Sequence, residues 1–439
     1  MIGNFPWDPF PPGEPDPKGP DPVHIAAYRA AVTAADAYHA VRLALRREGG
    51  TLRVGNRFVP DGRYREVAFV AVGNAAASMG LAALHALGDR LTQGFLAGPD
   101  AVPPELPFQG VTLPPGYPGA AVAETVVRAA MEIATDLTAQ DLFLVLLSPG
   151  AVRGLALPPR GMSVDEFSNL LTDAHDRGAS GREVGLLARV LGTGAVGGRL
   201  ARAVPRADAA ALLVVRGDGA NVLGGGPMTP VSDLERSETR TVLDRLGLAS
   251  VLPASVTEPS GSTSTAPTGH QSRPVVVADP AEALRAATDT VFAKGWTVRL
   301  ASLEIREGPE EAARGFLGRS DELYAAERLT TESRTKGVAT FAMATLGLPE
   351  GTDEGPALAT FLAKARLLAR RREMSVGLFR TAGDIGAPGF PPGAVIGAPT
   401  DVEAKVPPDR ARGLRMRRGI TDVGCLAVAV YPKPVSPSA

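Results

Sequence analysis

Apolar positions along this chain follow two patterns, short continuous runs and longer stretches with helical spacing. The continuous runs, each of strand length, are Val67–Val72, Asp141–Leu147 and Ala209–Val215. Helical spacing is found in Val23–Glu48, Ala75–Leu87, Ala120–Leu137 and Gly181–Leu191. We expect Gly49-Gly50 to end the first of these helices. Strands without polar alternation are typical of a parallel sheet covered on both faces. The pattern therefore predicts an α/β fold with a Rossmann-like parallel sheet in the amino-terminal domain.

Changes in composition predict the domain boundaries. Residues 253–274 are rich in Ser, Thr, Pro and Gly, which is typical of a linker. We expect the Rossmann-like domain at 23–252 and a smaller carboxyl-terminal α/β domain at 275–433. The expected elements of that smaller domain are Val275–Val277, Pro280–Lys294, Trp296–Leu303, Pro309–Leu329, Pro356–Glu373 and Cys425–Tyr431. Residues 1–22 contain eight prolines and should form an extended Pro-rich tail.

Charge, cysteine content and hydropathy exclude several classes of protein. The formal net charge of the 439 residues is −1, so we expect no general attraction to nucleic acid or to an anionic membrane surface. No apolar run reaches the roughly 20 residues needed to span a bilayer, and the first residues lack the features of a secretory signal. Cys425 is the only cysteine, which excludes an internal disulfide and a cysteine zinc cluster. These features predict a cytoplasmic location.

Lysine is almost absent from the chain. Its six lysines include none between positions 26 and 293, so arginine carries the positive charge of the whole first domain. A GC-rich genome would produce this bias. A mechanism that needs a lysine ammonium in the first domain is excluded, and the planar guanidinium of arginine is not an equivalent substitute.

The turns that follow the three predicted strands form the candidate site. Ligands of parallel α/β sheets bind beyond the carboxyl ends of the strands, which here are residues 73–75, 148–154 and 216–227. Asp218 comes just after a buried strand, where a carboxylate can hold Mg²⁺ or accept the proton of a substrate hydroxyl. The alternative is that Asp218 is a turn residue. Ser148 lacks the Gly-x-Ser-x-Gly elbow of a nucleophile, which favours a structural turn.

The segment Gly192–Gly197 matches the glycine fingerprint of dinucleotide-binding proteins, with Asp218 near the position of the ribose-binding acid. That fingerprint requires a strand before it, whereas Gly181–Leu191 has helical spacing. Nicotinamide binding at this segment is therefore not expected. The five histidines have no metal-ligand spacing, so we expect no metal site built from them.

The order of the motifs resembles the class of glycerate 2-kinases that carry a carboxyl-terminal MOFRL domain, over nearly the whole chain. The Gly-Lys-Ala turn of that family corresponds to residues 73–75, so Asn74 stands at the lysine position. Another stretch of that family begins with a histidine, and Tyr117 stands at this histidine position here. The Ser-Gly-Gly-Ala-Ser turn of the family corresponds to residues 148–152. Its Lys-Gly-Gly-Arg-Leu-Ala segment corresponds to residues 196–201, without the lysine.

The Gly-Asp turn and the Gly-Pro pair after it are the best preserved of the family motifs. The Gly-Asp turn is present as Gly217-Asp218, followed by Gly226-Pro227. In the second domain, Glu332 stands where a Gly-Glu pair is expected, and residues 381–386, including Asp384, resemble a Thr-Asp-Gly-x-Asp-Gly turn.

The resemblance implies ATP-dependent phosphorylation of D-glycerate with a divalent metal such as Mg²⁺, and a small organic acid or a nucleotide as ligand. The candidate catalytic residues are Asp218, Arg153 and Arg216, with Asp218 also as metal ligand. The candidate cofactor-binding residues are Gly73, Asn74, Ser148, Gly150, Gly226, Glu332 and Asp384.

Three hypotheses remain open from the sequence. The leading hypothesis is a glycerate-kinase-like protein whose kinase activity is lost or altered, because expected charged residues are replaced. The second is an active kinase in which Arg153 or Arg216 takes the role of the missing lysine. The third is a non-catalytic interaction or regulatory protein that binds partners through the Pro-rich tail.

Overall fold

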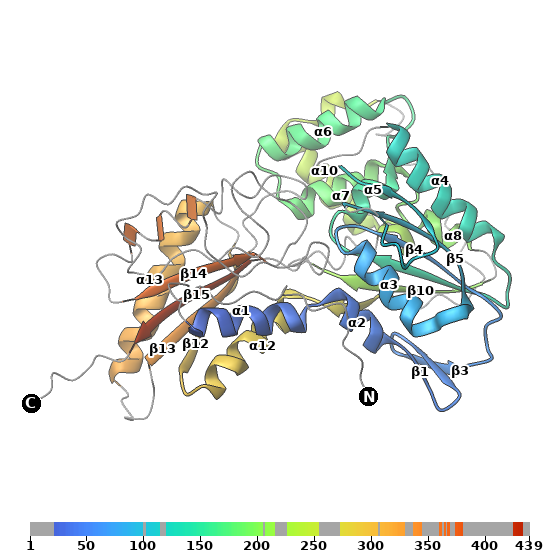
Figure 1. Cartoon of the computed structure of the whole chain (residues 1–439). Helices are drawn as coiled ribbons and strands as arrows, with labels where there is room; N and C mark the ends of the chain where they lie inside the picture. Colours follow the sequence, from blue (N-terminus) through green and yellow to red (C-terminus); the bar gives the residue numbers. More distant parts are fainter. Residues whose placement is uncertain are drawn as a thin grey trace, which may run out of the picture. The chain divides into compact units, whose positions relative to one another are not determined.

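A computed structural model shows the protein as two compact units (Figure 1). It describes residues 22–99, 102–114, 120–204, 207–215, 226–253, 273–305, 308–329, 337–344, 374–380 and 425–432, with helical pieces at 360–361, 364–365 and 367–368. The larger unit extends from Ala37 to Val277. The smaller unit contains the described residues up to Asp36 and those from Ala278 onward.

A six-stranded sheet, in the order β11-β10-β7-β4-β5-β6, forms the centre of the larger unit. The strands are β4 (Val67–Val72), β5 (Leu91–Gly98), β6 (Gln109–Thr112), β7 (Leu142–Leu147), β10 (Asp208–Val214) and β11 (Val275–Ala278). The pairings from β10 to β6 are parallel, which confirms the parallel sheet expected from the buried apolar runs. The chain builds outward from β4 first through β5 to β6 and later through β7 to β10. The strand order therefore reverses between β4 and β7, which is where ligands bind in open α/β sheets.

Helices cover both faces of this sheet. The helices are α2 (Ala37–Ala44), α3 (Ala76–Leu87), α4 (Ala120–Asp136), α5 (Ala151–Leu155), α6 (Val164–Asp176), α7 (Gly181–Leu191), α8 (Arg199–Ala203) and α10 (Asp233–Leu246). The short 3₁₀ helices η1 (Gly88–Arg90) and η2 (Ala249–Val251) and the two-residue strands β8 (Ala156–Leu157) and β9 (Thr193–Gly194) complete the unit. Residues of α4 to α10 form one buried cluster with alternate strand residues, while α3 packs against β4, β5 and β7. The helix α7 confirms that no strand precedes Gly192, so the glycine fingerprint lacks its required context.

The region 23–48 differs from the single helix that was expected. It forms α1 (Pro22–Ala34), α2 and then the strand β1 (Leu45–Glu48), which pairs with β2 (Thr51–Val54) and through it with β3 (Arg57–Pro60). Gly49 and Gly50 have φ of 56° and 79°. Positive φ at both central residues is the requirement of a tight hairpin turn. The glycine pair therefore forms the hairpin turn between β1 and β2, whereas the helical spacing had suggested the end of a helix.

A four-stranded mixed sheet, in the order β12-β13-β15-β14, forms the smaller unit. Its strands are β12 (Thr297–Ile305), β13 (Gly337–Ala344), β14 (Ser375–Arg380) and β15 (Cys425–Pro432), with helices α12 (Pro280–Ala293) and α13 (Pro309–Leu329). β12 and β13 are parallel, whereas β15 is antiparallel to β13 and β14. This mixed sheet and its helices confirm the expected α/β class of the second, smaller domain. The expected helix at 356–373 lies mostly outside the described residues.

The unit boundaries differ from the predicted 23–252 and 275–433 at two elements. The helix α1 belongs to the smaller unit, where it packs along α12, and Figure 1 shows the two helices side by side. The strand β11 is the outer strand of the large sheet instead of the first strand of the second domain. Local apolar spacing identified both elements, but it carries no information about which sheet each one packs against.

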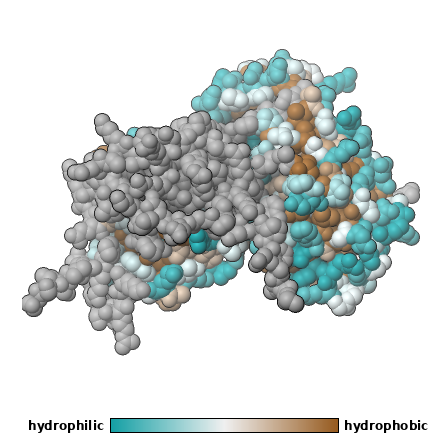
Figure 2. Space-filling view, in the orientation of Figure 1, coloured by the Kyte–Doolittle hydropathy of each residue, from teal (hydrophilic) through white to brown (hydrophobic). Residues whose placement is uncertain are grey.

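The surface of the larger unit is mixed in polarity. Figure 2 shows apolar residues in brown among hydrophilic residues in teal on the visible face of this unit. Exposed large apolar side chains such as Phe58 and Leu234 are scattered over different elements, which is normal for a folded protein. Among the described residues, no helix has the length and apolar character needed to cross a bilayer.

Candidate functional site

Two turns meet at the carboxyl edge of the sheet, one after β4 and one after β7. Gly73 has φ of 114°, and a Cβ at this position would lie 2.3 Å from the carbonyl oxygen of Ser148 and 2.5 Å from its Oγ. Only glycine allows this approach, because real Cβ atoms do not come so close to backbone. The structure thus brings together Gly73, Asn74, Ser148 and Gly150, as the sequence predicted from the strand ends.

Ser148 links the two turns through hydrogen bonds. Its side chain is fully buried, and its Oγ accepts a hydrogen bond of 2.9 Å from the backbone amide of Ala75. Its own amide donates to the carbonyl oxygen of Val72 at 3.1 Å. This geometry gives Ser148 the role of a brace between the turns, in line with the structural turn that the sequence favoured over a nucleophile.

The backbone amides of the turn before α3, and that of its first residue Ala76, donate to protein oxygens. The amide of Gly73 donates to Ala97 O at 2.9 Å, and that of Asn74 donates to Pro149 O at 2.8 Å. The amide of Ala75 donates to Ser148, and that of Ala76 donates to Gly73 O at 3.1 Å. Phosphate groups bind at helix starts through free amides of this kind. In this conformation, amides 73 to 76 are not available for a phosphate.

Arg153 brings a positive charge to the same place. Gly150, with φ of 91°, precedes α5, and a Cβ on it would lie 3.0 Å from Nη2 of Arg153 and 3.1 Å from Oδ1 of Asn74. Both side chains are partly buried and fill the space over Gly150. The site therefore combines one guanidinium and one neutral amide at the point where the resemblance expects a lysine ammonium.

Asn74 also lines a small pocket. It has room for about one water molecule. Its lining residues come from α3, the ends of β5 and β6 and the loop between them, namely Asn74, Ala76, Ala77, Leu96, Gly98, Pro99, Val102 and Val111. This lining is apolar apart from Asn74, so the pocket adds no charge to the site.

The predicted site residues on later turns are described only in part. Gly226 is buried, its carbonyl oxygen accepts a 3.2 Å hydrogen bond from the amide of Gly198, and a Cβ on it would lie 3.6 Å from Val152. This contact places Gly226 beside α5 at Val152. Arg216, Asp218, Glu332 and Asp384 lie outside the described residues, and so does Tyr117.

No metal centre is formed by the part of the chain that the structure describes. Within that part, no three His, Cys, Asp or Glu side chains gather closely enough to hold an ion. Two buried acids, Asp141 and Asp208, lie at the opposite, amino edge of the large sheet. There Asp208 accepts a 2.8 Å hydrogen bond from Tyr64, and Asp141 accepts one of 2.6 Å from the hydroxyl of Thr138. These two carboxylates are structural and are remote from the turns that follow β4 and β7.

Sequence reasoning missed Arg189, a buried arginine that contacts the segment following the Gly217-Asp218 motif. Its partners are Glu235, Thr229 and Pro230. A Ser-x-x-Glu pattern at Ser232 and Glu235 marks the start of α10 and could have been recognised in the sequence. Its contact with an arginine 46 positions away could not.

The comparisons with curated proteins agree with the resemblance. A glycerate kinase from Danio rerio is 30% identical over 251 residues, which cover 53% of this chain and 49% of that protein. A D-glycerate 2-kinase from Thermotoga maritima is 30% identical over 195 residues, which cover 43% of this chain and 46% of that protein. The chain spans about half the length of these curated relatives.

Solved structures extend the likeness in fold to nearly the whole chain. A crystal structure of a Pyrococcus horikoshii OT3 protein has a TM-score of 0.66 at 17% identity and covers 94% of this chain. The crystal structure of glycerate kinase from Thermotoga maritima has a TM-score of 0.63 at 20% identity and covers 93% of this chain and 98% of its own. The family model described as "Domain of unknown function (DUF4147)" matches residues 24–259. Since this match covers more than half of the residues, the chain belongs to the DUF4147 family and is related in sequence to glycerate kinases.

Proposed function

We propose that this chain is a glycerate-kinase-like protein in which ATP-dependent phosphorylation of D-glycerate is lost or altered. The relationship to glycerate kinases supports the family reaction as the starting point. The observation that carries the proposal is the turn after β4, where amides 73 to 76 are all engaged within the protein and the side chain at the lysine position is the neutral Asn74.

The number of cations that can balance the phosphate charge determines how much kinase activity can remain. Phosphoryl transfer depends mainly on positioning and on cations that balance the phosphate charge. Removing one preorganised charge contact from an active site costs on the order of 10²–10³ in rate. The larger unit has no lysine at all, and the resemblance also implies a lost histidine position at Tyr117. Several such losses together leave little basis for an ordinary kinase rate.

An assay with purified protein, ATP, Mg²⁺ and D-glycerate tests this proposal. We expect turnover well below the 1–10³ s⁻¹ that is typical of enzymes. Turnover within that range, with ADP and phosphoglycerate formed in equal amounts, would reject the loss of activity.

The second candidate is an active glycerate kinase that uses arginine in place of lysine. The guanidinium of Arg153 beside Asn74 favours it, since this group lies over the turn where the ammonium is expected. If activity is retained, ATP and Mg²⁺ are the cofactors, with Asp218 as the metal ligand and with Arg153 and Arg216 facing phosphate. Changing either arginine to alanine should then abolish turnover while the melting temperature stays within a few degrees of the parent.

The same proposal extends to the smaller unit, to the location of the protein and to its ligand. We assign a MOFRL-like domain to the smaller unit, a cytoplasmic location, and a small organic acid or nucleotide as ligand. A non-catalytic role through the Pro-rich residues 1–22 is tested by comparing partners captured with and without that segment. An unchanged set of partners would remove the segment from consideration.

A further inference from the structure

Arg189 on α7 is an unusual buried charge. It is the arginine with the least exposure among the described residues, with 2% of its side chain accessible. Burial lowers the pKa of its guanidinium to about 10, which still leaves it charged near neutral pH. A buried charge is costly unless the groups around it compensate it by ion pairs or hydrogen bonds.

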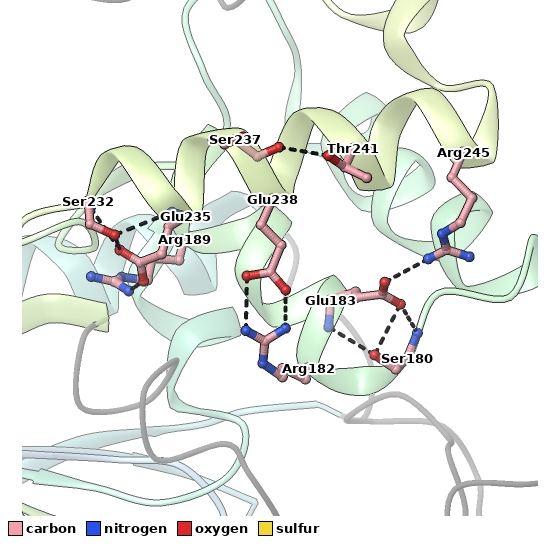
Figure 3. A network of polar contacts seen from close by, with 10 residues as sticks. All are labelled: Ser180, Arg182, Glu183, Arg189, Ser232, Glu235, Ser237, Glu238, Thr241 and Arg245. Atoms are coloured by element: carbon pink, nitrogen blue, oxygen red, sulfur yellow. Dashed lines mark hydrogen bonds and ion pairs between the residues drawn. The ribbon is translucent and has the colours of Figure 1, made fainter.

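The guanidinium of Arg189 holds two elements at once. Nη1 pairs with a carboxylate oxygen of Glu235, at the first turn of α10 (Figure 3). Nη2 lies 3.2 Å from the carbonyl oxygen of Thr229, 3.3 Å from its hydroxyl and 3.2 Å from the carbonyl oxygen of Pro230. One planar side chain thus fixes the start of α10 and two backbone carbonyls before it.

Gly198 also packs closely against this segment. This glycine has φ of 75°, and a Cβ on it would lie 2.7 Å from the backbone nitrogen of Pro230. Its amide donates to Gly226, which in turn lies against Val152, the residue before Arg153. A series of close contacts therefore leads from Arg189 through residues 226–230 to α5, the helix that bears Arg153.

Stability alone is a poor explanation for this arrangement. Replacing a buried ion pair by apolar residues of similar volume is often neutral or stabilising. The Nε of Arg189 has no hydrogen-bond partner within the described part of the chain, which adds to the cost of burial. A fixed backbone conformation is the gain that remains, because the guanidinium contacts backbone carbonyls and not only a carboxylate.

We propose that Arg189 is a positioning residue that fixes segment 226–230 against α5 and so holds the candidate site in shape. It acts through the backbone of Thr229 and Pro230, to whose carbonyl oxygens its guanidinium donates. The positioning role of Arg189 does not depend on the proposed function; only the identity of the ligand at the site does.

Arg245 supplies a matched control on the same helix pair. Its guanidinium pairs at 2.7 Å with Oε1 of Glu183, whose Oε2 caps the start of α7. Glu235 likewise caps α10 with Oε2 and pairs with Arg189 through Oε1 (Figure 3). The two arginines therefore join α7 and α10 in the same manner, but Arg245 pairs with Glu183 at the opposite end of the helix pair, away from residues 226–230.

Hydrogen exchange measured by mass spectrometry on the full chain tests the proposal. The readout is the exchange rate in peptides that cover residues 196–199 and 226–231. We expect Arg189→Met to raise it about tenfold, as loss of contacts to a charged group predicts, and Arg245→Met to leave it unchanged. Arg189→Lys should recover part of the protection, because an ammonium can replace some of these contacts.

A double variant separates positioning from simple instability. Arg189→Met with Glu235→Gln removes both charges of the pair and keeps a side chain that can cap α10. We expect raised exchange in 226–231 here too, with α10 itself protected as in the parent. Parent-like exchange of 226–231 in either Arg189→Met variant, or an equal rise in Arg245→Met, would overturn the proposal.

Calorimetric titration with Mg-ATP and with D-glycerate adds a separate readout. If the parent binds either probe, Arg189→Met should weaken binding about tenfold and Arg245→Met should not. If binding is unchanged in Arg189→Met, the proposed link to the site is wrong. If the parent binds neither probe, the identity of the ligand fails while hydrogen exchange still decides the role of Arg189.

Discussion

Replacing Gly73 by alanine should destabilise the larger unit more than the same change at a glycine with free space. The new Cβ would lie 2.3 Å and 2.8 Å from the carbonyl oxygens of Ser148 and Pro149, so the two turns would have to move apart. The φ of 114° adds strain of roughly 1–3 kcal/mol for a residue with a side chain, and the overlap adds roughly 1–3 kcal/mol.

Gly178 is the control for this change. Its φ of 92° carries a similar backbone strain, but no atom lies within 4 Å of the position of its Cβ. The difference between Gly73→Ala and Gly178→Ala therefore isolates the overlap between the turns. At roughly 2–4 °C per kcal/mol, calorimetry should show Gly73→Ala melting several degrees below Gly178→Ala. Equal melting temperatures would refute the close approach of the two turns.

Three further changes test the sites described above. Ser148→Ala removes the oxygen that accepts the amide of Ala75 and should cost about 1–3 kcal/mol in denaturant unfolding; no loss would exclude the bracing role. Burial opposes the charged form of Asp141, but hydrogen bonds from Thr138 and the charge of Arg65 outweigh it and hold the pKa below its usual value. The ionised carboxylate stabilises the fold at pH values above its unfolded pKa of about 3.9, and this stabilisation is lost as pH falls through the folded pKa. In Asp141→Asn, the free energy of unfolding should therefore fall less between about pH 5 and 2 than it does in the parent. Burial, helped by the bond to Asp208, raises the pKa of Tyr64 to about 12. The neutral hydroxyl of Tyr64 contributes its full stabilisation below about pH 10, and this stabilisation is lost toward pH 12. The free energy of unfolding of Tyr64→Phe should therefore fall less between these pH values than that of the parent; an identical fall in both proteins would contradict this.

The sequence predicted the central strands well because they are buried on both faces. β4, β7 and β10 are continuous apolar runs, and their carboxyl ends define the turns of the site. β5 was not predicted, because polar residues and Gly94 interrupt its apolar pattern. In the structure a Cβ at Gly94 would lie 2.0 Å from the ring of Phe69 on β4, so the glycine makes room for a neighbouring side chain. Such a requirement arises from packing and leaves no local signal.

The site was predicted in part for the same reason. Gly73, Asn74, Ser148 and Gly150 meet because parallel strands end at one edge, which sequence order alone can indicate. The engagement of the turn amides depends on distances between two loops, and the role of Arg189 depends on a segment 40 positions later. Neither is a periodic property of the chain, so neither could be read from spacing.

The placement of α1 has a consequence for how the chain folds during synthesis. This helix leaves the ribosome first among the described elements, yet its main packing partner is α12, which is complete only once Ala293 has been added. At about 5–20 residues per second, the interval is on the order of tens of seconds. Throughout that time the apolar side of α1 has no native partner from the smaller unit, while the larger unit is free to form its own core.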